Sequence, residues 1–224
     1  MSDYLEAFVP PIVVDPTHAA LLIVDMQYAS TSRDHGLGAR LRERGRVADG
    51  TYRFDRIERL VVPNLQRLLA VARRGAVRVV YLTVGSEVSD FSDLPLHMRS
   101  YSEWVGNVRG RREHEILDEL CPLETELVLN KVTTGGFSSS SLDACLRALG
   151  VTDLLIAGVS TNSCVETTAR DAADRGYRTV LIDDACAAAR PELHEATLTS
   201  FRRFFGRVAT TDELIAELGS GTSP

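Results

Sequence analysis

Residues 154–176 read LLIAGVSTNSCVETTARDAADRG, a strand, a tight turn and a helix in immediate succession. The apolar run at 154–157 is too short for a helix and meets Gly158 at once, so it predicts a buried strand. Helix-compatible residues then continue from 163 to 175 and end at Gly176, a residue typical of helix C-termini. A buried strand that leads directly into a helix is typical of a parallel α/β sheet.

The same alternation extends outward over the rest of the chain. Helical periodicity occupies residues 57–72, 139–149 and 191–204, and Pro63 predicts a kink or restart in the first of these helices. Short apolar runs between the helices predict further buried strands at 20–24, 77–83, 127–129, 179–182 and 207–209. We therefore predict an α/β fold of three αβα layers, Rossmann-like, with a central and mostly parallel sheet.

The length predicts one domain, because 224 residues with 44% apolar composition can bury a full core. We assign the whole chain, 1–224, to this domain, with a core over about residues 17–218. Residues 28–52 and 85–112 interrupt the alternation. Long insertions of this kind form lids, binding loops or subunit contacts, and solvated surface loops are the alternative.

The charge balance indicates a small-molecule partner. A net charge of -6 and a pI near 5.4 disfavour a nucleic-acid or anionic-membrane surface, since both need clustered Lys and Arg. We see no leader in residues 1–11 and no run of the ~20 apolar residues that a spanning helix needs. Four cysteines without a CxxC pair fit neither a zinc cage nor a disulfide scaffold. We expect a cytoplasmic protein with reduced thiols.

Three reactive residues lie where predicted strands end. Asp25 and Lys131 each close a strand, and Cys164 opens a helix, where free amides and a positive potential lower a thiol pKa. Each alone has an ordinary interpretation: a turn cap, a solvated lysine, a buried structural cysteine. The ends of parallel strands converge, however, so together they predict one catalytic site. Asp25 would take the thiol proton, Lys131 would stabilise charge, and nearby amides would bind an oxyanion.

Other chemistries have weaker support in the sequence. A Cys–His dyad would need a histidine from the insertions or their borders, namely His35, His97 or His114. The histidines lack HxH or HExxH spacing, and neither GxGxxG nor GxxxxGK[ST] follows a strand. We expect no metal and no cofactor, and we interpret Cys145 and Cys186 as structural.

Three motifs resemble the isochorismatase-like cysteine hydrolases: LIVDMQ at 22–27, KVTTGGF at 131–137 and GVSTNSCVETT at 158–168. The resemblance implies a six-stranded parallel sheet, an Asp25–Lys131–Cys164 triad, and a homodimer or homotetramer. It also implies a cis peptide between Val159 and Ser160, which turns the Ser160 amide toward the substrate beside that of Cys164.

The resemblance further implies an amidohydrolase reaction, in which Cys164 forms a thioester, Asp25 protonates the departing amine and then activates water, and ammonia is released. Residues 84–90 lack the Asp-x-His metal motif of nicotinamidases, and isochorismatases proper lack the cysteine. The chain looks most like ureidoacrylate amidohydrolases, with biuret hydrolases and N-carbamoylsarcosine amidases next. A catalytically silent binding or scaffold protein, and a nucleotide-binding module, are the competing classes.

Substrate contacts are predicted within or beside the motifs, at Gln27, Tyr28, Phe137 and Asn162, with core packing as the alternative for Phe137. Arginines of the insertions are candidates to clamp a substrate carboxylate, and solvation or a subunit contact is their alternative. These arginines are Arg33, Arg40, Arg99, Arg109 and Arg111.

Overall fold

A six-stranded sheet in the order β3-β2-β1-β4-β5-β6 forms the centre of the computed structural model, which describes residues 4–5, 8 and 10–220. All neighbouring strands run parallel, so the predicted three-layer fold is confirmed and its sheet is parallel throughout. The strands are β1 (Ala19–Val24), β2 (Arg78–Val84), β3 (Leu127–Lys131), β4 (Asp153–Val159), β5 (Arg178–Ala187) and β6 (Arg207–Ala209).

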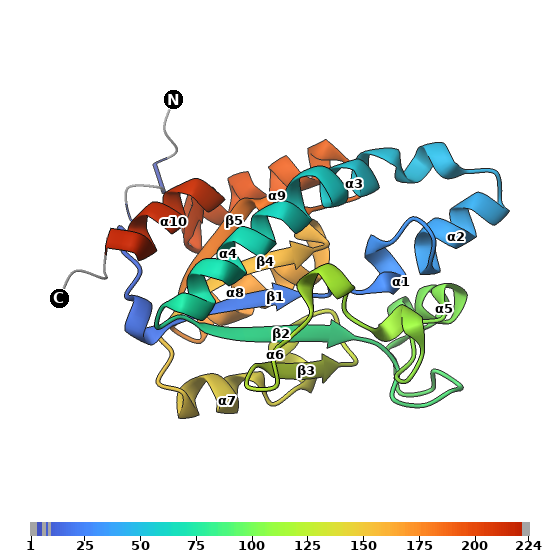
Figure 1. The fold of residues 1–224 in the computed structure, drawn as a ribbon, viewed down its shortest axis with the longest axis horizontal. Helices are drawn as coiled ribbons and strands as arrows, with labels where there is room; N and C mark the ends of the chain where they lie inside the picture. The colour runs from blue at the N-terminus through green and yellow to red at the C-terminus, as the bar shows by residue number, and fades with distance from the viewer. Residues whose placement is uncertain (1–3, 6–7, 9, 221–224) are drawn as a thin grey trace.

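Helices cover both faces of the sheet (Figure 1). On one face α4 (Val62–Arg74) packs against α10 (Thr211–Ser220). On the other face α8 (Glu166–Asp174) packs against α6 (Gly136–Ser139) and α9 (Pro191–Phe204), and α7 (Leu142–Ala148) contacts α6. The central strands β1 and β4 are buried along their whole length, which explains why their sequences are apolar without alternation.

Pro63 marks a restart of the long helix that follows the first insertion, as predicted. The chain is helical from α3 (Thr51–Arg56) through a π-helical segment (Ile57–Val61) into α4. Proline has no N–H to donate, and just before it the Val62 N–H reaches back five residues to the Ile57 carbonyl. The helix therefore passes the proline by widening one turn.

Two predicted boundaries change in the structure. The helix predicted at 139–149 begins only at Leu142, as α7, and the short helix α6 precedes it; the Ser140 hydroxyl separates the two, because it donates to the Gly136 carbonyl and accepts from the Leu142 N–H. The strand predicted at 179–182 extends over all of β5, whose pairing with β4 shifts register between Ile156 and Gly158. Such an irregularity interrupts the ladder without ending the strand.

The two insertions pack together beyond the carboxyl ends of β1 and β2 (Figure 1). The first contains α1 (Tyr28–Thr31) and α2 (Gly36–Glu43), and the second contains α5 (Leu96–Val105). Arg40 Nε donates to the Trp104 carbonyl at 2.8 Å, and the Arg44 guanidinium lies 4.5 Å from the Trp104 ring centre. We call residues 28–52 and 85–112 together the cap.

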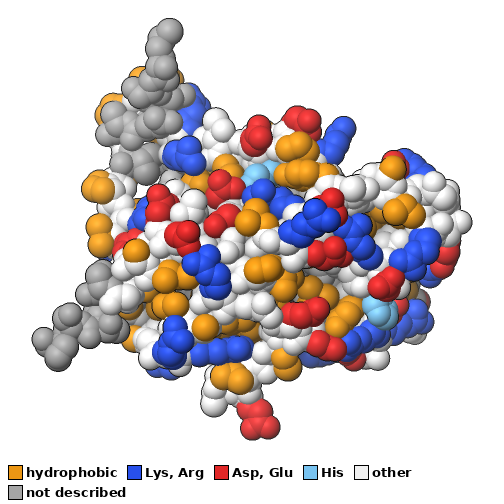
Figure 2. Space-filling view, turned by 45° about the horizontal axis from the view of Figure 1, so that its top comes forward, with side chains coloured by type: hydrophobic (Ala, Val, Ile, Leu, Met, Phe, Trp, Pro, Cys, Tyr) orange, Lys and Arg blue, Asp and Glu red, His pale blue; other side chains and the backbone are white. Residues whose placement is uncertain are grey.

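Charged side chains of both signs are mixed on the face shown in Figure 2, with apolar side chains scattered between them. Ion pairs between elements include Arg73 with Glu126 at 2.8 Å and Arg67 with Asp212. Across residues 4–5, 8 and 10–220, no helix has the length and apolar character needed to cross a bilayer.

Candidate active site

The site lies where the strand order reverses. From β1 the chain adds β2 and β3 on one side and then returns to place β4 on the other side of β1. At such a switch point the loops after the two strands diverge and leave a crevice at their carboxyl ends. Val24 pairs with Gly158 there, so the residues that follow these two positions face each other.

Gly158 allows this close approach. Its φ is +119°, and a Cβ at this position would lie 2.0 Å from the Val24 carbonyl oxygen. No side chain fits that space, and L-residues rarely adopt that φ. Asp25 itself has a φ of 53°, a left-handed conformation that is uncommon outside glycine. The backbone is therefore constrained on both strands at the entrance to the site.

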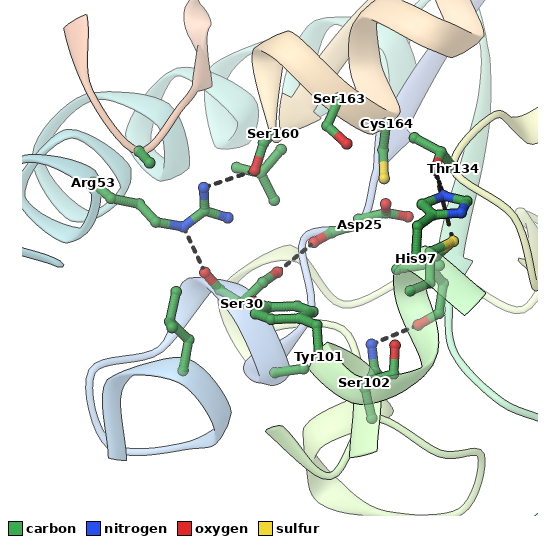
Figure 3. Close-up of a pocket in the computed structure, with 17 residues that line it drawn as sticks. Asp25, Ser30, Arg53, His97, Tyr101, Ser102, Thr134, Ser160, Ser163 and Cys164 are labelled. Atoms are coloured by element: carbon green, nitrogen blue, oxygen red, sulfur yellow. Dashed lines mark hydrogen bonds between the residues drawn. The ribbon is translucent and has the colours of Figure 1, made fainter. Parts of the chain in front are cut away.

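Asp25, Lys131 and Cys164 meet at this position, from three different strands. The Lys131 ammonium is fully buried and donates to Asp25 Oδ2 at 2.9 Å and to the Thr133 carbonyl at 3.2 Å. Cys164 lies in the π-helical segment Thr161–Val165 that precedes α8, and both Asp25 and Lys131 influence its pKa. Figure 3 shows the Cys164 sulfur directed toward Asp25.

Burial controls the protonation of these three groups. It raises the pKa of the Asp25 carboxyl, against the opposing charge of Lys131. Burial and then the Asp25 charge raise the pKa of the Cys164 thiol to about 12, although Lys131 lowers it. For Lys131, burial lowers the pKa, but the negative charges of Asp25 and Cys164 outweigh burial and raise it overall.

The site thus contains a buried lysine–aspartate pair, 2.9 Å apart, beside a thiol whose raised pKa keeps it neutral. This corrects the expectation that the helix N-terminus would lower the thiol pKa, because desolvation and the neighbouring carboxylate have the larger effect. A neutral thiol needs a base before it can attack, and the Asp25 carboxylate is the adjacent one.

A cavity of about 390 Å³ opens beside Asp25 and Cys164 (Figure 3). The turn after β4 contributes Ser160 and Ser163 to its wall, and the cap contributes much of the rest, including His97 and Tyr101. The Val159–Ser160 peptide bond is cis, and the Ser160 carbonyl accepts from the Ser163 and Val165 amides at 2.9 and 3.3 Å. The insertions therefore shape the cavity.

The four residues predicted as substrate contacts lie outside the wall of this cavity. Gln27 is buried, and its amide accepts from the Val84 N–H and donates to the Val84 and His114 carbonyls, so it fastens the strand ends. The Tyr28 hydroxyl interacts with Arg112 and with the Asp118 N–H instead. These two residues hold loops rather than face the cavity.

Phe137 and Asn162 differ from the prediction for opposite reasons. Phe137 packs in the main core with its ring centre 5.9 Å from that of Tyr177, which is the core alternative stated above. Asn162 is exposed at the surface of the turn. A helical turn presents only part of its circumference to a cavity, and Ser163 and Cys164 occupy that part here.

The predicted arginines have partners elsewhere. Arg33 pairs with Asp55 and Glu58, and Arg99 donates to the Ser92 and Leu94 carbonyls. Arg40 and Arg109 pair with glutamates, and none of the five predicted arginines lines the cavity.

Sequence reasoning missed several polar residues of the cavity wall, of which Arg53 and Asn107 are the most telling. Both are about 95% buried, with exposed fractions of 5%. Arg53 had one available signal: it lies four residues before the buried Ile57, so a charge stands on the apolar face of a helix. Asn107 lies just after the C-cap of α5 in the second insertion, and no signal in the sequence distinguishes it.

Only one of the candidate histidines approaches the site. His97 lines the cavity, with Thr134 Oγ1 3.2 Å from its Nε2. His114 Nε2 lies 2.9 Å from Asn130 Oδ1, and His35 stacks edge-on against Tyr28. Among the described residues, no group of three or more His, Cys, Asp or Glu side chains is arranged to hold a metal ion.

The remaining cysteines lie away from the triad. Cys186 is fully buried beside the Ile156 carbonyl, Cys145 is partly buried on α7, and Cys121 is exposed. Burial raises the pKa of the Cys186 thiol to about 12.

An aspartate, a lysine and a cysteine at the switch point of a parallel sheet define the class: an α/β protein with a thiol site at its strand ends. The sequence model of the isochorismatase domain matches residues 19–213, and the chain belongs to this family. The resemblance found in the three motifs is thereby confirmed.

Relatives of known name agree with this assignment. The ureidoacrylate amidohydrolase RutB of Acinetobacter baylyi is 32% identical over 226 residues, covering 94% of this chain and 88% of the relative. The RutB of Caulobacter segnis is 31% identical over 224 residues, covering 93% and 89%. Both names denote hydrolases of carbon–nitrogen bonds, in agreement with the predicted enzyme class.

Solved structures show the same fold. A cysteine hydrolase from Pseudomonas syringae pv. phaseolicola superposes with a TM-score of 0.78 at 27% identity, covering 95% of this chain and 98% of that one. N-carbamoylsarcosine amidase from Thermoplasma acidophilum gives 0.64 at 26% identity, covering 87% and 96%.

Proposed function

We propose that this protein is a metal-independent cysteine amidohydrolase, which cleaves a carbon–nitrogen bond of a small ureido or carbamoyl compound through a Cys164 thioester and releases ammonia. The observation that carries the proposal is the buried Lys131–Asp25 pair beside the Cys164 thiol, at the wall of a cavity. The names of the relatives support the amide chemistry.

Acylation would begin with transfer of the thiol proton to Asp25, whose raised pKa makes it a competent base within a dry site. The thiolate then attacks the amide carbonyl carbon and forms the new carbon–sulfur bond. As the carbon–nitrogen bond breaks, Asp25 returns the proton to the departing nitrogen, which leaves as ammonia. The Lys131 ammonium stabilises the negative charge of the site while the proton moves between Cys164 and Asp25.

Deacylation reverses the same proton movement. Asp25 takes a proton from water and the hydroxide attacks the thioester carbonyl; the carbon–sulfur bond then breaks, and the Cys164 sulfur receives the proton from Asp25 and becomes a thiol again. The oxyanion in both steps would be stabilised by the backbone amides of Ser160 and Cys164, at the first turn of the helical segment that starts after β4. A carbamoyl substrate would leave a carbamate, which decomposes to carbon dioxide and an amine.

Asn107 supports a substrate with an N–H donor. Its Nδ2 donates to the Val84 carbonyl at 2.7 Å, which fixes the amide orientation and leaves Oδ1 buried without a partner among the described residues. A buried acceptor that lines a cavity is costly unless a ligand satisfies it. A ureido or carbamoyl N–H has the chemistry to do so.

Ammonia release is the direct test. Wild type and Cys164→Ala are assayed in parallel, with and without EDTA, on ureidoacrylate, biuret, N-carbamoyl amino acids, maleamate and nicotinamide. We expect turnover of a ureido or carbamoyl compound that survives EDTA and falls by at least about 10⁴-fold in Cys164→Ala, the scale seen for lost nucleophiles. No turnover of any compound, or equal turnover by Cys164→Ala, would contradict the proposal.

A further inference from the structure

Arg53 is a buried cation without a carboxylate partner, at the wall of the cavity that holds Cys164. Burying an isolated charge costs several kcal/mol in effective terms, so buried cations are normally paired. In the part of the chain that the structure describes, no Asp or Glu contacts Arg53, whereas the neighbouring Arg56 bonds Asp183. Burial lowers the pKa of Arg53, but a guanidinium stays charged in proteins.

The guanidinium is held rigidly by neutral groups. Its Nε donates to the Ser30 carbonyl at 2.9 Å, and its Nη1 donates to the Ser160 hydroxyl at 2.8 Å. Figure 3 shows the remaining nitrogen, Nη2, turned toward the middle of the cavity. Two of the three guanidinium nitrogens thus fix the orientation of the group, and the third can donate a hydrogen bond to a ligand in the cavity.

The charge of the cavity wall favours an anion. Asp25 also lines the cavity, but its charge is already compensated by Lys131 at 2.9 Å. The remaining positive charge is that of Arg53, which is only 5% exposed and is therefore weakly screened by solvent. An anionic group of a ligand would supply the missing counterion.

We propose that Arg53 is a specificity-determining residue that binds a carboxylate of the substrate, so that the enzyme acts on acids that carry the ureido or carbamoyl group. The nature of the cleaved group rests on the function proposed above, whereas the anion site does not. Uncharged members of the same chemical class, such as biuret, lack the group that Arg53 pairs with and are expected to be poor substrates.

A pair of alkylating reagents tests the anion site without a known substrate. Iodoacetate and iodoacetamide both form a carbon–sulfur bond with loss of iodide. They differ in one group, which is a carboxylate in iodoacetate and a neutral amide in iodoacetamide. Peptide mass spectrometry gives the ratio of their rates at Cys164, with the exposed Cys121 as an internal reference. General effects on thiol reactivity cancel in this ratio.

The expected result is a higher iodoacetate preference at Cys164 than at Cys121 in the wild type. In Arg53→Met the preference at Cys164 falls by about tenfold to a hundredfold, as expected for loss of a charge-assisted hydrogen bond. Arg53→Lys keeps the charge and retains part of the preference. Arg59→Met removes an exposed arginine from the same helical stretch and leaves the ratio unchanged.

A purely structural role of Arg53 predicts a different pattern. If Arg53 only positions Ser160, then Ser160→Ala lowers the preference as much as Arg53→Met does. That result would overturn the proposal. So would a ratio in folded Arg53→Met within about twofold of wild type, because the loss of one charged contact should have a much larger effect. Arg53→Lys serves as the deciding variant if Arg53→Met fails to fold.

Turnover separates this inference from the proposed function. On an N-carbamoyl amino acid and its methyl ester, wild type should prefer the acid, and Arg53→Met should lose that preference mainly through KM. Equal turnover of acid and ester by wild type would contradict the anion site at Arg53 but would agree with the proposed hydrolase activity. Absence of turnover would sink the hydrolase, and the alkylation ratio would still decide the role of Arg53.

Discussion

At the residue scale, burial and two charged neighbours set the acidity of the Cys164 thiol. The carboxylate of Asp25 raises the thiol pKa and Lys131 lowers it, so the two neighbours act in opposite directions. The thiol therefore stays neutral until it can pass its proton to Asp25.

Asp25→Asn is expected to separate thiol acidity from catalysis. Removing the carboxylate charge lowers the Cys164 pKa from about 12, because Lys131 becomes the counterion of the thiolate. Cys164 should then react faster with iodoacetamide at pH 8, while amide hydrolysis falls by about 10²–10⁴-fold for want of a base. Alkylation rates between pH 6 and 11 measure the shift. Slower alkylation of Asp25→Asn throughout this range would contradict it.

The loss of activity at low pH is expected to follow from the same groups. In the proposed mechanism the carboxylate form of Asp25 is the base, and burial raises its pKa above 3.8 in the folded protein. Activity should therefore be lost on acidification at a higher pH than an ordinary aspartate would give. The pH dependence of kcat/KM checks this, and a limb at or below pH 3.8 would be inconsistent with the raised pKa.

At the scale of elements, the close contact of β1 and β4 creates the site. Gly158 and Asp25 both have positive φ. The two strand ends lie so close together that a Cβ at Gly158 would clash with the Val24 backbone. The loop after β1 and the turn after β4 can then bring a carboxylate and a thiol together. Strain at such positions is maintained by the packed strands on either side.

Gly158→Ala should cost about 3 kcal/mol or more of unfolding free energy, since it combines a left-handed φ with a backbone clash against Val24. Gly150→Ala is the matched control: its φ is also positive, at +69°, but a Cβ there meets no atom within 4 Å. We expect a cost of about 1–2 kcal/mol for the control. Denaturant unfolding compares them, and equal costs would show that the Val24 contact is unimportant.

At the scale of the whole molecule, the cap turns an open crevice into a cavity. The two insertions lie far apart in the sequence, and they are joined through Arg40, Arg44 and Trp104. Trp104 in turn lies 6.3 Å, ring centre to ring centre, from Tyr101 of the cavity wall. The cap thus links substrate binding to a contact outside the sheet.

Trp104→Ala should raise KM by about fivefold, the worth of one cation–π contact, and change kcat and the unfolding free energy little. The reason is that the contact belongs to the cap and leaves the sheet untouched. Leu96→Ala, at an exposed position of the same helix, is the control and should behave as wild type. An unchanged KM in Trp104→Ala would show that cap packing does not shape the binding site.

Assembly also belongs to this scale. The homodimer or homotetramer expected from the family resemblance stays a prediction. Light scattering coupled to size-exclusion chromatography measures it, and a mass near 24.6 kDa would contradict it.

The sequence by itself determined the parallel α/β fold and the three residues that meet at the strand ends. Buried strands are apolar on both faces, and residues directly after them reach the same sheet edge whatever the loops do, so Asp25, Lys131 and Cys164 could be placed from local pattern alone. The same reasoning could not assign Gln27 or Phe137, because a position next to a motif does not determine which way its side chain faces.

Only the tertiary structure decided the protonation of the triad and the composition of the cavity. Burial sets the pKa of Cys164, and burial is a property of the packed molecule rather than of the helix end that precedes α8. Arg53 and Asn107 come to the cavity from segments more than 50 residues apart, an association that depends on long-range packing. Local sequence fixes which residues end a strand, whereas three-dimensional packing fixes which of them face a substrate.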